Sequence, residues 1–193
     1  MTSSLHRAVA IVAFLNLTYF GVEFSVAVAI GSVSLFADSI DFLEDAAINL
    51  LILLALGWSA RKRSLVGMVL AVILLAPGIA TLWTAWQKFN LPIPPEAVPL
   101  SLAALGALAV NLYCAFLLAR VRSHGGSLSR AAFLSARNDA LANVAIIAAG
   151  LVTAVTASPW PDVIVGLSIF LINLDAAREV FATAKMERRE AKA

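Results

Sequence analysis

Long apolar segments alternate with short polar connections along the whole chain. Runs of about 20 apolar residues have the length that crosses roughly 30 Å of hydrocarbon as a helix. The 193 residues contain six such runs, and these predict membrane spans at 8–30, 35–56, 65–86, 97–119, 131–156 and 162–182. The pattern predicts an all-α polytopic membrane protein, with a six-helix transmembrane domain at 1–182 and a short basic tail at 183–193.

The composition supports a lipid bilayer as the surroundings of this chain. Hydrophobic residues make up 61% of it, charged residues only 13%, and the mean hydropathy is +0.91, whereas a soluble domain is about half apolar and a quarter charged. Cys114 is the single cysteine, and both histidines, His6 and His124, lie outside the apolar runs. These counts exclude an intramolecular disulfide framework and a metal site built on cysteines.

The basic residues lie on one side of the predicted bundle. The net charge is +2, and 12 of the 14 lysines and arginines fall at the amino terminus, the 2–3 and 4–5 connections and the carboxyl end. By the positive-inside rule both termini are predicted to be cytoplasmic, in the inner (plasma) membrane of a bacterium. No basic stripe or aromatic platform accompanies these charges, so nucleic acid is not an expected partner.

Ionisable residues inside the spans concentrate in two of them. The second span carries four carboxylates within eight residues, the fifth carries Arg137 and Asp139, and the third and fourth carry no charge; the four are Asp38, Asp41, Glu44 and Asp45. A charged group at membrane depth costs several kcal/mol unless it faces a partner or a cavity. The clustering therefore predicts a functional site between the second and fifth spans.

The spacing of these side chains sharpens the prediction. Residues i, i+4 and i+8 form one stripe along a helix, and Asp41, Asp45 and Asn49 occur at this interval in the second span. Ser135, Asp139 and Asn143 repeat it in the fifth span. If the stripes face each other, three carboxylates converge in a medium of low dielectric, where a divalent cation would neutralise them.

Arg137 offers a structural alternative in which ion pairs only hold the helices together. It lies about 200° around the helix from both Ser135 and Asp139, so it points away from their stripe and could reach Glu44 or the interface. Asp38 is either a carboxylate on the entry path or a partner of Arg137. Asp162 is predicted to cap the amino end of the sixth helix.

Several stretches together resemble the cation diffusion facilitator family of divalent-metal transporters. They are Asn16, Glu23, the segment 31–45 (GSVSLFADSIDFLED), Asn111, the segment 127–143 and Trp160-Pro-Asp162. The resemblance implies a homodimer of six-helix domains that transports a divalent ion. Because the same oxygens can hold a metal ion or protons but not both, we expect exchange with protons, with net export from the cytosol. The resemblance also implies a metal site with two ligands each from the second and fifth helices.

The resemblance carries Asp41, Asp45 and Asp139 into the metal site. Ser135 stands where most members have histidine, which leaves a ligand set made only of oxygens, completed by Asn138, Asn143 or a water molecule. No prosthetic group is expected, because the ion is cargo. Zinc is the first expectation, as the commonest substrate in the family, with Mn²⁺, Co²⁺, Fe²⁺ and Cd²⁺ left open. The cytoplasmic domain that most members carry after the sixth helix is not expected in the remaining tail.

Two other classes of function remain as alternatives. An intramembrane aspartyl enzyme would pair Asp45 with Asp139, but its glycine-rich motif is missing and Ser135 has no activating partner, so the chain is not expected to be an enzyme. A structural or regulatory membrane subunit without transport is the other alternative. The roles of Asn16 and Glu23 stay open between metal transport and hydrogen bonding across helices.

Overall fold

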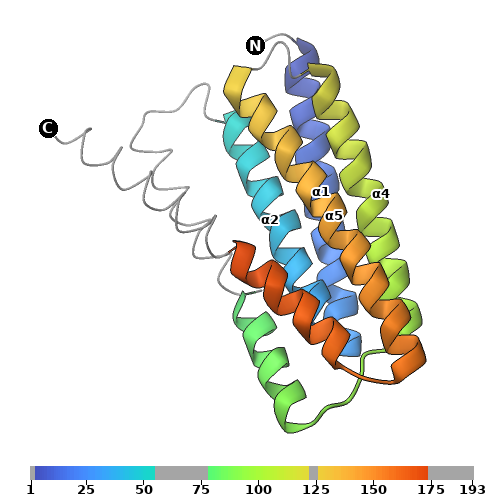
Figure 1. The fold of residues 1–193 in the computed structure, drawn as a ribbon. Coiled ribbons are helices and arrows are strands. Elements are labelled where there is room, and N and C mark those ends of the chain that lie inside the picture. The colour runs from blue at the N-terminus through green and yellow to red at the C-terminus, as the bar shows by residue number, and fades with distance from the viewer. Residues whose placement is uncertain (1–2, 55–77, 122–125, 174–193) are drawn as a thin grey trace, which may run out of the picture.

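The computed structural model describes residues 3–54, 78–121 and 126–173, apart from some side chains, among them those of 126–137. Four long helices stand side by side: α1 (Ser3–Ile30), α2 (Val33–Leu54), α4 (Ala97–Val121) and α5 (Gly126–Thr156) (Figure 1). Two shorter helical segments, 78–90 and 160–173, pack across the end opposite the amino terminus of α1. We call this the loop end, since it carries the α1–α2 turn and the connection 91–96.

The predicted all-α membrane fold is confirmed, and the described residues contain no strand. Within the described ranges, three helices are long and apolar enough to cross a membrane, at His6–Ile30, Ala97–Arg120 and Asn138–Thr156. The helix α2 is also as long as a membrane span, but its four carboxylates make it less apolar than these three helices. The parts of the predicted third and sixth spans at 65–77 and 174–182, and the tail at 183–193, lie outside the described residues.

A glycine turn reverses the chain between α1 and α2. Gly31 has φ +62°, a left-handed conformation that costs glycine little, and the Ser32 amide donates to the Ala27 carbonyl at 3.2 Å. This six-residue closure ends α1 as a Schellman motif. The Ser32 hydroxyl then accepts the Leu35 amide at 3.2 Å and so caps the start of α2.

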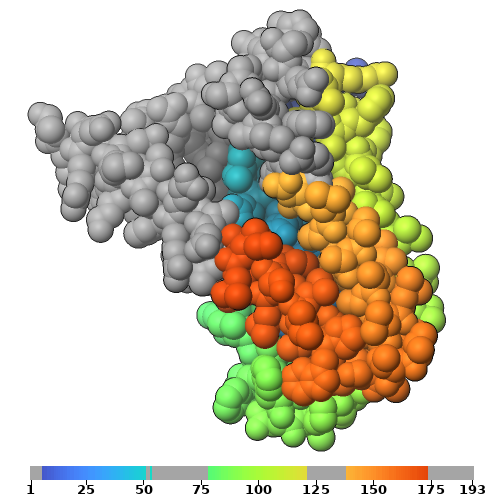
Figure 2. All heavy atoms as spheres, viewed as in Figure 1, coloured from blue at the N-terminus to red at the C-terminus, as the bar shows by residue number. Residues whose placement is uncertain are grey.

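The segment 160–173 approaches the start of α2 very closely. A Cβ added at Gly166 would lie 2.6 Å from the Ser34 nitrogen and from the Val33 carbonyl carbon. Only glycine fits this contact without displacement of one backbone from the other. Beside it, Val33, Ala85 and Val163 form a small apolar cluster that joins α2 to both loop-end segments. The space-filling view shows segments 160–173 (red) and 78–90 (green) at this end of the molecule (Figure 2).

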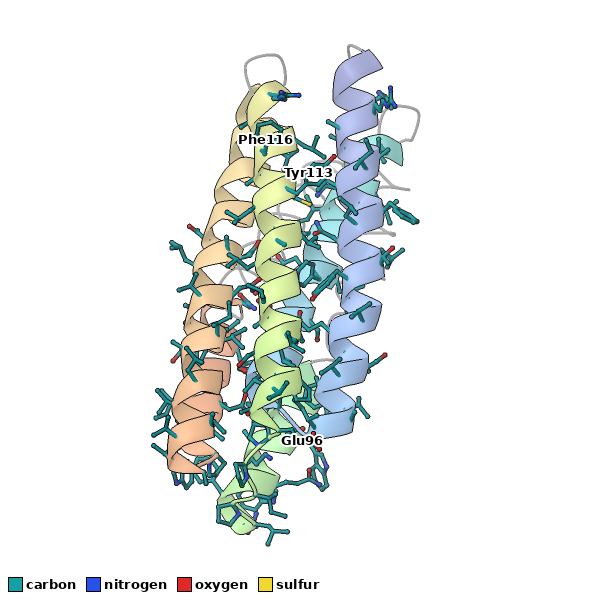
Figure 3. The ribbon with its side chains drawn as sticks, turned by 90° about the vertical axis from the view of Figure 1, so that its right-hand side faces the viewer. Glu96, Tyr113 and Phe116 are labelled. Atoms are coloured by element: carbon teal, nitrogen blue, oxygen red, sulfur yellow. The ribbon has the colours of Figure 1, made fainter. Side chains whose placement is uncertain are left out.

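The apolar core of the bundle combines alanines with larger apolar side chains. Its largest buried cluster joins α1, α2, α4, α5 and the segment 160–173, and consists of Ala27, Leu35, Phe36, Ala37, Leu100, Ala103, Ala104, Ile146 and Ile169. Small residues let helix backbones approach closely in a membrane. Other large apolar side chains point outward, as Tyr113 and Phe116 do on α4 (Figure 3). This distribution suits a protein whose surroundings are lipid.

Candidate metal site

The acidic face of α2 points into the bundle. Asp38 is fully buried, Asp45 is 8% exposed and Asn49 is 2% exposed, while Asp41 is half-buried. The first three lie within about 40° of each other around the helix, and Asp41 lies about 60° from Asp38. The amide of Asn49 donates to the Asp45 carbonyl of its own helix at 2.7 Å. The carboxylates of α2 thus lie among the other helices and not in lipid.

A buried hydrogen bond ties this face of α2 to α5. Asn143 Nδ2 donates to Asp38 Oδ2 at 2.6 Å, and the Asn143 oxygen accepts from Asn111 Nδ2 of α4 at 3.4 Å. None of these three side chains is more than 2% exposed. Three helices are therefore joined by one polar contact at the middle of the bundle, where water is excluded and such contacts are worth most.

The hydrogen bond between Asp38 and Asn143 also fixes the register of the neighbouring carboxylates. The two helices run antiparallel, because α2 begins at the loop end and α5 ends there (Figure 1). Asp41 comes three residues after Asp38, and Asp139 four residues before Asn143, so both lie roughly 5 Å from the bond in the same direction along the helices. Asp139 lies close enough to both Asp41 and Asp45 to interact with them electrostatically.

Asp41, Asp45 and Asp139, which we call the aspartate site, lie near one another, but their carboxylates do not converge on a single point. Among the residues that the structure describes, no three acidic, histidine or cysteine side chains are close enough to hold a metal ion as they stand. Nearby carboxylates without a cation repel each other. The carboxylate oxygens of α2 and α5 can bind one ion only if the three aspartate side chains move closer together.

The other residues predicted for the site fall into three groups. Asn143 lies close to the aspartates, but both ends of its amide take part in the hydrogen bonds to Asp38 and Asn111. Asn138 is exposed at the edge of α5. Ser135 and Arg137 belong to α5, but their side chains lie outside the described part of the chain. Asp38 accepts a hydrogen bond from Asn143 Nδ2.

A second acidic contact, on the α1 side of α2, was not anticipated from helix spacing. Glu23 is fully buried, and its carboxyl group lies within hydrogen-bonding reach of Asp38. Asn16, two turns earlier on α1, is also fully buried and lies 3.9 Å from the sulfur of Cys114. The signal for both residues was their position in the family motif, since nothing in α1 alone indicates which helix they face.

Asp162 corrects one prediction. It was expected to cap its own helix, but its carboxylate accepts hydrogen bonds from the start of α2: the Val33 amide at 2.8 Å, the Ser34 amide at 3.1 Å, and the Ser32 and Ser34 hydroxyls at 2.7 and 2.6 Å. The positive end of the α2 dipole favours this carboxylate. Local sequence could not show that a different helix would lie within reach.

Comparison with known proteins identifies the family of the chain. The family described as the cation efflux transmembrane domain matches residues 9–185. The zinc transporter ZitB of Pectobacterium atrosepticum is 30% identical over 167 residues, which cover 80% of this chain and 51% of that protein. The ZitB zinc transporters of Escherichia coli and Yersinia pestis are 29% and 27% identical over 159 residues, or 76% of this chain and 51% of each. The chain spans about half the length of the curated relatives it matches.

Proposed function

The chain belongs to the cation efflux transmembrane family, and on this premise we propose that it moves a divalent cation, Zn²⁺ first, out of the cytosol in exchange for protons. The family is one of transporters and not of enzymes. Its relatives named above are zinc transporters of bacteria, which supports zinc as the first substrate to test and the bacterial plasma membrane as the location.

The aspartate site is the proposed binding place for the ion. Asp41 and Asp45 supply oxygens from α2 and Asp139 from α5, with Ser135, Asn138 or water to complete the shell. The observation that carries this assignment is the buried hydrogen bond between Asp38 and Asn143, because it brings the acidic faces of α2 and α5 together. We leave Asn143 out of the proposed ligands, since its amide already binds Asp38 and Asn111.

Exchange with protons follows from the chemistry of these ligands. Three carboxylates in a water-poor site need positive charge nearby, and either a divalent cation or protons can supply it. Ligand oxygens that hold protons cannot at the same time hold the ion, so metal binding releases protons. If the site opens alternately to the two sides of the membrane, ion movement one way drives proton movement the other way.

Transport by the purified chain in proteoliposomes tests this function. Uptake of Zn²⁺, Mn²⁺, Co²⁺, Fe²⁺ and Cd²⁺ driven by a pH gradient is compared between the wild type, Asp45→Asn and Asp139→Asn. Replacement of a residue that only hydrogen-bonds to a metal ligand lowers metal affinity about 10–100-fold. Replacement of a ligand itself should therefore lower uptake at least tenfold. Glu96→Gln is the matched control, because Glu96 is exposed at the loop end (Figure 3).

The outcomes separate the remaining alternatives. Equal uptake by the wild type and both aspartate variants would overturn the site. A wild type that folds but neither binds nor moves any of the ions would instead support a structural or regulatory membrane subunit.

We further propose a homodimer, as the family resemblance implies. Light scattering of the chain in detergent would give twice the protein mass of 20.3 kDa if this is right, and a single protein mass if it is wrong.

A further inference from the structure

Glu23 and Asp38 form a buried pair of acids next to the aspartate site. Glu23 comes from α1 and Asp38 from α2, and neither side chain has any exposed surface. Their carboxyl groups are close enough for one to hydrogen-bond the other. We call them the acid pair.

Most oxygens of the acid pair have no donor. Within the described residues, nothing donates to either oxygen of Glu23 or to Asp38 Oδ1. Only Asp38 Oδ2 is satisfied, by Asn143 Nδ2 at 2.6 Å. A buried polar atom left without a partner costs about 1–3 kcal/mol, and more when it is charged. Three such atoms at one contact indicate that something able to bridge carboxyl oxygens belongs there.

A proton can bridge the two carboxyl groups without any additional ligand. Two ionised carboxylates have no proton to donate, and they repel each other where water is excluded. One proton turns the contact into a hydrogen bond from a carboxylic acid to a carboxylate, which satisfies an oxygen on each side. A metal ion would need additional ligands, because Zn²⁺ takes about four and Mg²⁺ about six.

We propose that Glu23 and Asp38 share one hydrogen ion and form a proton-binding site separate from the metal ligands. The charged groups that act on Glu23 are the carboxylates of Asp38 and Asp41 on α2, and Tyr19 lies beside it on α1. Between residues 100 and 119 of α4 and between residues 138 and 156 of α5, the ionisable side chains are Tyr113, Cys114 and Asp139. In the described surroundings of Glu23 no basic side chain offsets its charge.

If the chain transports a divalent ion as proposed above, the acid pair is placed to release its proton when the ion binds. Asp38 lies one helical turn from Asp41, so a divalent ion at the aspartate site adds positive charge close to the shared proton. The O–H bond then breaks, its electron pair stays on the carboxylate, and the proton leaves to solvent. Metal binding would in this way release a proton that no metal ligand had carried.

Infrared spectroscopy of the full chain without metal tests the acid pair directly. A protonated carboxylic acid has a carbonyl-stretch band that an ionised carboxylate lacks. We expect the band in Glu23→Gln and in Asp38→Asn to be weaker than in the wild type by one acid group, and the band in Glu96→Gln to be unchanged. Two variants are used so that either can serve if the other does not fold. An unchanged band in a folded variant would overturn the proposal.

Proton release on Zn²⁺ binding supplies the second measurement. A pH indicator in weakly buffered solution counts protons per bound ion, and Zn²⁺ binding is measured on the same samples. We expect Glu23→Gln to bind Zn²⁺ but to release one proton fewer per ion than the wild type and Glu96→Gln. Equal release would refute the coupling. A wild type that binds no Zn²⁺ would refute the proposed function, while the infrared result would still decide the acid pair.

Discussion

At the scale of single residues, Asp162 has an effect that its place in the sequence does not suggest. Its carboxylate satisfies two amides and two hydroxyls at the start of α2, a contact between segments about 130 residues apart. The first amides of a helix have no partner within the helix itself. Asp162 therefore connects the α1–α2 turn to the helical segment 160–173.

Replacement of Asp162 should destabilise the loop end. Asp162→Ala leaves buried donors without an acceptor, and we expect a loss of about 3 kcal/mol in the free energy of unfolding. Denaturation of the purified chain in mixed micelles measures this loss. Glu96→Ala removes an exposed carboxylate nearby and should change stability by less than about 0.5 kcal/mol. Equal effects of the two substitutions would contradict the role given to Asp162.

Lys88 predicts a dependence of stability on pH. It lies past the predicted end of the third span, where it donates to the Ile93 carbonyl. Burial lowers the pKa of Lys88 from 10.5, and the carboxylate of Asp162 opposes that shift. Between the lowered value and 10.5 the unfolded chain binds more protons than the folded chain, so this contribution to stability rises with pH.

The comparison with Lys88→Met isolates this effect. Melting temperatures of the wild type and the variant are measured from neutral pH to about 10.5. The stability of the wild type relative to the variant should increase as the pH rises. A relative stability that stays constant or falls over that range would show that the ammonium group is not disfavoured by folding.

At the scale of helices, close backbone contact decides how the elements fit together. Gly166 lies against the backbone of α2 so tightly that any side chain must displace one of the two. Gly166→Ala should cost about 1–3 kcal/mol by overpacking, measured as a lower melting temperature. Gly21→Ala is the matched control: a Cβ at Gly21 meets nothing within 4 Å, and alanine favours the helix by about 1 kcal/mol. A stabilised Gly166→Ala would contradict the contact.

The side-chain pattern of α2 and α5 indicated which faces of the two helices carry the oxygen-bearing residues. The repeat of oxygen-bearing residues at intervals of four indicated which faces would form a site if the two helices met. The hydrogen bond between Asp38 and Asn143 lies close to those faces. The spacing could not show that Asn143 would bind Asp38, because this depends on the relative height of two helices separated by about a hundred residues. It also could not place Glu23 beside Asp38, since an isolated carboxylate on α1 carries no information about its neighbour.

At the scale of the whole molecule, the distribution of lysines and arginines predicts which end of the bundle faces the cytoplasm. Single cysteines test this, because the native Cys114 is fully buried and should not react with a water-soluble maleimide. In intact cells the variants Asn90→Cys and Glu96→Cys at the exposed loop end should be labelled. His6→Cys, at the start of α1, should be labelled only after the membrane is permeabilised. The reverse pattern would place both termini outside.

The sequence by itself determined that the chain is helical, that it lies in a membrane, and which helices carry the acidic side chains. These features depend on local composition and period, which each segment displays alone. Only the tertiary structure decided that Asp162 caps α2, that Asn143 binds Asp38, and that Glu23 and Asp38 are in contact. Each of these depends on the height and rotation of one helix against another. Those are set by packing of small residues such as Gly166 at the contacts, and not by any property of a single segment.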